Sequence, residues 1–317
     1  MVGSKNKSDV LVAAPEASLR ATPPEARPGS RLPVQKAYKM YVGGEFIRSE
    51  SGRYQQVTDA LTGERENAPR ASRKDARDAV TKGHAAFAPW SARTAYNRGQ
   101  ILYRLAEVME ARSNDLAREV RRASGADQAS ADAEVFASID RVLHYAGWSD
   151  KIGALLATSN PVAGPHFNFT VPEPMGLVAV LAAKRPALLG LVTAVLPIVV
   201  SGNTVLVLVS EEAPRLAQTF GECLATSDLP GGVVNLLTAE HAEVAPHLAR
   251  HMEIAALSVW SGDDALRKSL DEHATNSVKR VRHHRLAEAD FVDDRHQGLF
   301  AIERFIEQKT VWHPVGI

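Results

Sequence analysis

The sequence predicts an α/β fold with a doubly wound parallel sheet, and three observations support this. The chain has 317 residues, 45% of them hydrophobic, which is enough to bury a substantial core. From residue 177 to residue 260, short apolar runs alternate with segments at helical spacing. These runs are continuously apolar and rich in β-branched residues, as in strands buried on both faces. Alternating strands and helices of this kind form Rossmann-like sheets.

The segment before this region contains a tail, a hairpin and helices. Residues 1–36 are rich in Ala, Pro, Ser and charged residues, which predicts a disordered tail. Met40 and Val42 alternate before the turn at Gly43 and Gly44, and apolar residues resume at Phe46 and Ile47, which predicts a β-hairpin. Helical spacing, with Ser72 placed as the first cap, predicts three helical stretches, namely 72–90, 94–120 and 131–152.

The alternating region predicts the sheet itself. Its apolar runs predict four strands, at 177–182, 204–210, 232–238 and 254–260. The segments between them predict three helices, at 187–202, 213–228 and 241–251. Lys184 and Arg185 interrupt the most apolar stretch of the chain, and we expect them in a solvated loop between a strand and a helix. The organisation expected is therefore a tail (1–36), one domain (37–280), and a polar connector with a C-terminal strand (281–317).

Composition argues against several function classes. Lys plus Arg equals Asp plus Glu, at 37 each, so no net charge attracts nucleic acid or an anionic membrane. The single cysteine, Cys223, argues against a disulfide framework or a multi-cysteine zinc site, and fits a reducing, cytoplasmic location. No signal peptide is evident, and the apolar run from residue 187 to residue 200 is too short to span a bilayer.

Several motifs of the chain point to one known enzyme family. The stretch PMGLVAVLAAKRP followed by SGNTVLVLVSEE, from residue 174 to residue 212, resembles the cofactor-binding half of the aldehyde dehydrogenase superfamily. YVGGEF resembles its opening hairpin, while YAGWSDKI and LPGGVVN are further matches. The closing FIEQKTVWHPVG is similar to the family's last strand, which serves in subunit contacts. The resemblance covers roughly residue 38 onward and implies a truncated member that lacks the domain with the catalytic cysteine.

Family chemistry requires a thiolate nucleophile and an oxyanion hole. Cys223 shares a helical face with Leu216, Phe220 and Leu224, so we expect its thiol in the core, where thiols are usually inert. Arg185 stands where the resemblance places the oxyanion-hole Asn. We therefore predict no catalytic residue in this chain, although Arg185 and Lys184 could bind an anionic group.

The resemblance also implies an NAD(P) site, which is degenerate here. Glu211 and Gly262 match the family's cofactor-binding positions, but Leu208 stands in place of the expected Lys. Asp263 falls beside the expected pyrophosphate, where like charges at about 4 Å cost on the order of 4 kcal/mol. It can instead cap a helix. Arg267 replaces a glycine. No bound cofactor is expected, with NAD or NADP as the alternative if the site is still competent.

Three histidines, His283, His284 and His296, lie in the polar connector. Their spacing matches no metal-ligand motif, and the sequence favours a solvated, partly disordered linker without a metal site.

These observations favour a catalytically inactive aldehyde dehydrogenase homologue that acts as a structural or regulatory subunit. The closing strand, 304–315, has no second domain of its own to pair with, so we expect it to bind a full-length aldehyde dehydrogenase or a second copy. An active NAD(P)-dependent oxidoreductase acting on the aldehyde or oxo group is the alternative. A binding module for another small molecule in the residual cleft is a third possibility.

Overall fold

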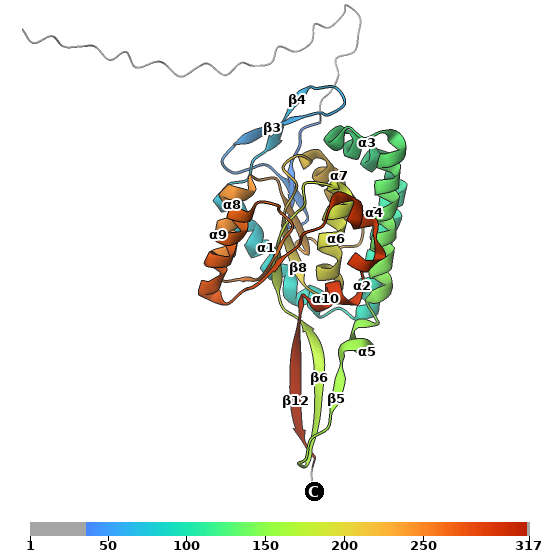
Figure 1. Ribbon diagram of the computed structural model, residues 1–317, viewed down its shortest axis with the longest axis vertical. Coiled ribbons are helices and arrows are strands. Elements are labelled where there is room, and N and C mark those ends of the chain that lie inside the picture. The colour runs from blue at the N-terminus through green and yellow to red at the C-terminus, as the bar shows by residue number, and fades with distance from the viewer. Residues whose placement is uncertain (1–35, 316–317) are drawn as a thin grey trace, which may run out of the picture. The chain divides into compact units, whose positions relative to one another are not determined.

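A seven-stranded sheet forms the centre of the protein in a computed structural model that describes residues 36–315 (Figure 1). The tail predicted for residues 1–36 falls outside this range except for its last residue. Five strands are parallel, in the order β11 (Arg280–His283), β10 (Ile254–Val259), β7 (Leu177–Leu181), β8 (Thr204–Leu208) and β9 (Val234–Leu237). An antiparallel hairpin, β1 (Met40–Val42) and β2 (Glu45–Ile47), extends the sheet beyond β9. The predicted doubly wound parallel sheet is confirmed.

Helices cover both faces of this sheet. Along β7, Val178 and Val180 face one apolar core, while Leu177, Ala179 and Leu181 face the other. The first core is covered by α2 (Ala95–Ala111), α3 (Ser113–Ser124), α4 (Gln128–Trp148), α6 (Ala187–Val200) and α7 (Pro214–Thr226). The second is covered by α1 (Arg73–Ser91), α8 (His241–Arg250) and α9 (Asp264–Ala274). A strand with apolar residues on both sides, as the sequence predicted, needs both layers.

Local capping explains where several helices begin and end. The Ser72 hydroxyl accepts hydrogen bonds from the backbone N–H groups of Lys74 and Asp75, and the Asp75 carboxylate accepts one from the Ser72 N–H, which makes a capping box. The stretch 94–120, expected as one helix, is two helices separated at Arg112. The stretch 131–152 is covered by α4 and, after a turn, the start of α5 (Ile152–Leu156).

A three-stranded arm leaves the body, with strand order β12 (Ile306–Pro314), β6 (His166–Pro174) and β5 (Thr158–Asn160) (Figure 1). The closing strand, for which the sequence predicts a partner chain, also has a partner strand in its own chain. β12 pairs antiparallel with β6 along its whole length, from Ile306 opposite Pro174 to Pro314 opposite His166. β6 was not predicted from the sequence, although Phe167, Phe169 and Val171 alternate with polar residues in it. A second small sheet joins β3 (Tyr54–Thr58) to β4 (Arg65–Pro69).

The polar connector is ordered and packed. Residues around His283, His284 and His296 were expected to form a solvated, partly disordered linker, but β11 adds to the sheet next to β10, while most side chains from residue 282 to residue 290 are exposed as expected. Short helices follow, η2 (Glu288–Val292), η3 (Asp294–His296) and α10 (Leu299–Glu303), and the Phe291 side chain is buried. Within residues 36–315, no helix is both long and apolar enough to cross a bilayer.

Candidate functional site

The sheet reverses its winding between β7 and β10. These strands are neighbours, yet β7 leads into α6 on one face and β10 leads into α9 on the other. Ligands of open α/β sheets bind in the crevice at such a switch point, beside the carboxyl ends of the strands. The loops that follow Leu181 and Val259 therefore define the candidate site.

The chain's own side chains fill this crevice. Ala183, just after β7, and Leu189, in α6, form a small core with Phe291, and Trp260, just after β10, packs against it. The ring centroids of Trp260 and Phe291 are 5.6 Å apart. On its other side, Trp260 stacks on the His284 imidazole at 3.8 Å with an interplanar angle of 4°. The segment from His284 to Phe291 thus covers the crevice, and we call the side chains of Trp260, His284 and Phe291 the aromatic plug.

Helix α4 holds the plug in place. The Arg141 guanidinium is buried and donates to the Phe291 carbonyl at 2.8 Å and to the Thr193 hydroxyl, in α6, at 2.7 Å. A buried guanidinium loses hydration, so each of these bonds offsets part of that cost. Arg141 therefore ties η2 to the two helices that flank the crevice.

His284 is kept neutral in the plug. Burial lowers its pKa to about 3, and the positive charges of neighbouring groups, including Arg304 and Arg267, act in the same direction. Its Nε2 lies 3.3 Å from the Ser258 hydroxyl, which also accepts from Trp260 Nε1 at 3.0 Å. Neutral imidazole stacks on the indole without a charge to solvate.

This pKa predicts acid sensitivity. The ordinary histidine pKa is 6.5, so below that pH this histidine is protonated in the unfolded chain. In the folded chain His284 stays neutral down to about pH 3. The free energy of unfolding should fall by up to about 1.4 kcal/mol per pH unit in this window. Urea unfolding between pH 6.5 and pH 5 should show a shallower pH slope for His284→Gln than for the wild-type chain. His296→Gln is the control, and identical slopes for all three proteins would refute the assignment.

The first turn of α6 is also occupied. Glu134, in α4, accepts hydrogen bonds from the backbone N–H groups of Leu188 and Leu189 at 2.7 and 3.2 Å. Burial raises the pKa of Glu134, while these two donors oppose the rise. Such N–H groups at a helix start are the usual binding point for a ligand phosphate. Here a protein carboxylate takes that place.

The two predicted cofactor positions lie on different loops, and the protein uses one of them internally. Glu211, after β8, accepts from the His241 N–H at the start of α8, at 2.7 Å. Gly262, after β10, is exposed, and a Cβ placed there would meet no atom within 4 Å. The contacts that the structure describes do not bring these two residues together.

Asp263 and Arg267 flank Gly262 at the start of α9. Asp263 is the N-cap and accepts from the Ala265 and Leu266 N–H groups at 2.9 and 3.1 Å. Arg267 is buried and donates to the His284 carbonyl at 2.8 Å, with its Nε atom buried and unpaired. A glycine at position 267 would have no side chain to hold the plug segment.

Lys184 and Arg185 lie where the sequence placed them, in the loop between β7 and α6. Both are exposed, and both approach Glu212, with Arg185 Nε at 3.4 Å and Lys184 Nζ at 3.9 Å. Exposed pairs of this kind contribute little to stability. Proline 186, which follows them, is buried at the start of α6.

Cys223 lies in the core, as predicted. Its side chain is fully buried in α7, and burial raises the pKa of the thiol to about 12. A thiol in this environment stays protonated at neutral pH, and only the thiolate is a strong nucleophile. Across residues 36–315, no cluster of three His, Cys, Asp or Glu side chains is arranged to hold a metal ion.

Sequence reasoning missed the residues that close the crevice. Glu134 and Arg141 belong to α4, more than fifty positions before the groups they bind. Phe291 and Val292 lie between charged residues and belong to no longer apolar pattern, so Phe291 gave no periodic signal. The available hint was its aromatic character within an otherwise polar segment.

Comparisons with known proteins agree with the architecture. Residues 46–284 match the sequence profile of the Aldehyde dehydrogenase family. A mitochondrial aldehyde dehydrogenase, family 2 member B4, of Arabidopsis thaliana is 30% identical over 77% of this chain and 45% of its own length. Retinal dehydrogenase 2 of Gallus gallus is 31% identical over 84% of this chain and 54% of its own.

Solved structures show the same fold. A betaine aldehyde dehydrogenase of Staphylococcus aureus, solved in complex with NAD⁺, superposes with a TM-score of 0.72 at 22% identity. The match covers 78% of this chain and 50% of that one. The chain thus spans about half the length of the two curated relatives it matches here.

Proposed function

This chain belongs to the aldehyde dehydrogenase family, and we propose that it is a catalytically inactive member that acts as a structural or regulatory subunit. The proposal rests above all on the aromatic plug. Trp260, His284 and Phe291 occupy the switch-point crevice where a Rossmann-like sheet takes its ligand.

The residues present do not fit a dinucleotide. Glu134 and Asp263 occupy the N–H groups at the starts of α6 and α9, and a bound phosphate would have to displace one carboxylate and lie near it. Glu211 is engaged at the start of α8. Cys223, buried and protonated, is no candidate nucleophile. We therefore assign no cofactor and no catalytic residue to the chain, and derive no chemical step.

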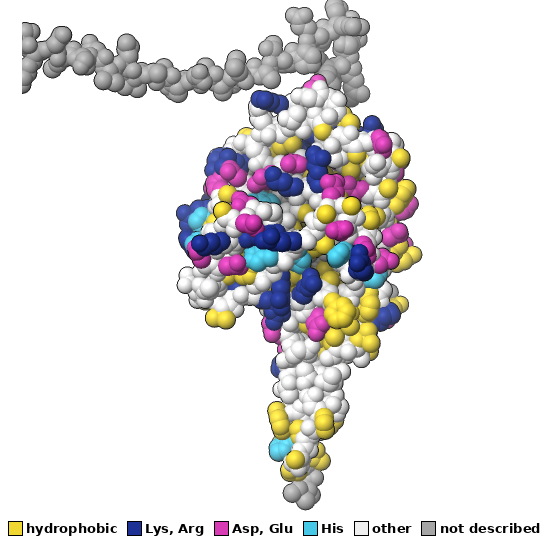
Figure 2. All heavy atoms as spheres, in the orientation of Figure 1, with side chains coloured by type: hydrophobic (Ala, Val, Ile, Leu, Met, Phe, Trp, Pro, Cys, Tyr) yellow, Lys and Arg dark blue, Asp and Glu magenta, His cyan; other side chains and the backbone are white. Residues whose placement is uncertain are grey.

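The arm supports a role in assembly. β12 is an edge strand, and in the described part of the chain its second edge meets no other strand. Such an edge is a template for pairing with another chain. Large apolar side chains are exposed towards the end of the arm, where Figure 2 shows them gathered, namely Phe167, Trp312 and Val315. We propose that residues 304–315 bind a full-length aldehyde dehydrogenase subunit or a second copy of this chain.

Native mass spectrometry tests this assembly. The full chain is co-expressed with a full-length aldehyde dehydrogenase from the same organism, and the expected result is a mixed oligomer or a homodimer. Phe167→Ser with Trp312→Ser should reduce its abundance about tenfold or more, since buried aromatic anchors dominate interfaces. Phe300→Ser, at another exposed aromatic position, is the matched control. A monomer alone, or an assembly that the double variant leaves unchanged, would contradict the proposal.

One observation favours an active NAD(P)-dependent oxidoreductase instead. Gly262 is exposed and has open space around it, which permits a close approach by a ligand. On this alternative, NAD or NADP would bind once the plug moved aside.

We also propose a cytoplasmic location for this chain. The Arabidopsis relative, by contrast, is named as mitochondrial.

A further inference from the structure

A second hollow lies apart from the switch-point crevice. It has a volume of about 730 Å³ and is bordered by the loop at Glu50 to Arg53, the first turns of α1, and α8 with the residue after it. Neither the aromatic plug nor Glu211 nor Gly262 contributes to its lining. Pockets of roughly 300–1,000 Å³ accommodate small-molecule ligands.

The lining of this pocket is strongly basic. Five cationic side chains border it, against two carboxylates. Both carboxylates are already engaged: Glu50 binds Lys74 at 3.1 Å, and Glu243 binds Arg53 at 2.8 Å. Glu243 also binds Arg70 from outside the pocket. The acidic groups therefore do not neutralise the remaining cations.

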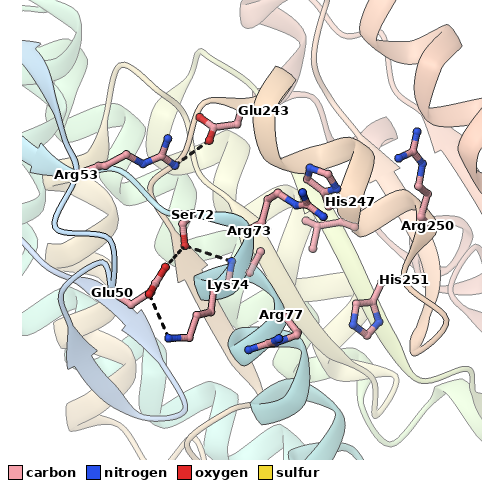
Figure 3. Close-up of a pocket in the computed structure, with 12 residues that line it drawn as sticks. Glu50, Arg53, Ser72, Arg73, Lys74, Arg77, Glu243, His247, Arg250 and His251 are labelled. Carbon is pink, nitrogen blue, oxygen red and sulfur yellow. Dashed lines mark hydrogen bonds and ion pairs between the residues drawn. The ribbon is translucent and has the colours of Figure 1, made fainter.

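Arg73 and Arg250 are left without a carboxylate partner among the described residues. No ion pair or side-chain hydrogen bond is recorded for Arg73, while Arg250 donates to the imidazole of His273, at 2.7 Å from Nε2. Figure 3 shows the side chains of Arg73, His247 and Arg250 in the same pocket, from α1 on one side and α8 on the other. Guanidinium groups without a carboxylate are available to bind an anion in a bidentate manner.

His247 lines the same pocket, and the charges of both arginines act on it. Its pKa is lowered, first by burial and then by Arg73 and Arg250, with His273 acting in the same direction and Glu243 opposing it. The pocket also borders the first turn of α1, where the helix dipole adds positive potential. Several positive groups thus face one space that contains no free carboxylate.

We propose that this pocket binds a small molecule through a phosphate or diphosphate group, with Arg73 and Arg250 as its principal ligands. The two guanidinium groups donate to the phosphate oxygens from opposite walls, and His247 lies beside them. Lys74 and Arg53 stay paired with Glu50 and Glu243 and line the pocket around this phosphate site. This site is independent of the crevice and of any dinucleotide binding there.

Calorimetric titration of the full chain with inorganic pyrophosphate, at constant ionic strength, tests the site. The wild-type chain should give saturable binding with a Kd below about 1 mM. Arg73→Gln combined with Arg250→Gln should weaken binding at least about tenfold, because both bidentate donors are lost. Arg104→Gln, an exposed arginine on α2 that pairs with Glu107, should bind like the wild-type chain. Absent saturation, or equal weakening in the control, would overturn the proposal.

A second readout uses the unmodified chain, so it does not depend on the folding of the double variant. The imidazole resonance of His247 is assigned by NMR from its disappearance in His247→Gln. Pyrophosphate should raise the pKa of His247, since a nearby anion stabilises the imidazolium. A pKa of His247 that stays unchanged in saturating pyrophosphate would place the anion elsewhere and refute the site.

Discussion

Replacing Phe291 with alanine should lower the free energy of unfolding by roughly 3–5 kcal/mol. The ring is 1% exposed and packs on Ala183, Leu189 and Trp260, so its removal leaves a cavity at the switch point. Neighbouring backbone cannot collapse freely into this space, because Arg141 holds the Phe291 carbonyl. Urea unfolding followed by circular dichroism measures the change.

The matched control is Phe300→Ala. That ring is 79% exposed, so its removal should change stability by less than about 0.5 kcal/mol. Equal effects of the two substitutions would mean that residues 284–292 do not pack into the crevice, and the account of a closed site would lose its main support.

Replacing Arg215 with glutamine should cost about 3–5 kcal/mol. Its side chain is 3% exposed and lies 2.9 Å from Glu66, with Asp59 at 3.9 Å and Glu119 at 3.8 Å. Arg122 bridges the same three carboxylates. Removing the buried cation leaves Arg122 alone to compensate three carboxylates, two of them buried, which is far more costly than losing an exposed pair.

The control for this cluster is Arg118→Gln, an exposed arginine that pairs with Asp115. It should change stability by less than about 1 kcal/mol.

Burial raises the pKa of Asp59, but the hydrogen bond from Arg122 and the nearby positive charges outweigh it and lower the pKa below the ordinary 3.8. The stabilisation from Asp59 is thus present above about pH 4 and lost as the pH falls further. A cost as small for Arg215→Gln as for Arg118→Gln would contradict this cluster.

The sequence predicted the sheet well because each strand carries its own signal. β7 and β8 are continuous apolar runs, and such runs are stable only between two helical layers. The hairpin was predictable because Gly43 and Gly44 both adopt positive φ, which glycine does readily. Neither β6 nor β11 is a continuous apolar run, and both strands pair with partners distant in sequence, β12 and β10 respectively.

The candidate site was less predictable from sequence. The family resemblance identified the positions of Glu211 and Gly262. Helical spacing correctly predicted that Cys223 is buried. Tertiary contacts close the crevice. Glu134 and Phe291 contact residues that are distant in sequence, and no local spacing of residues predicts such contacts. The sequence did not predict the basic pocket for the same reason. Arg73 and Arg250 line one pocket only because α1 and α8 pack together.

Calorimetric titration of the purified full chain with NAD⁺ and with NADP⁺ tests the closed crevice most directly. A full-length aldehyde dehydrogenase under the same conditions serves as the positive control. With the aromatic plug in place, we predict no saturable binding to this chain up to about 1 mM of either dinucleotide. Saturable binding with a micromolar Kd that Gly262→Val abolishes would show an open, competent cofactor site and contradict the account.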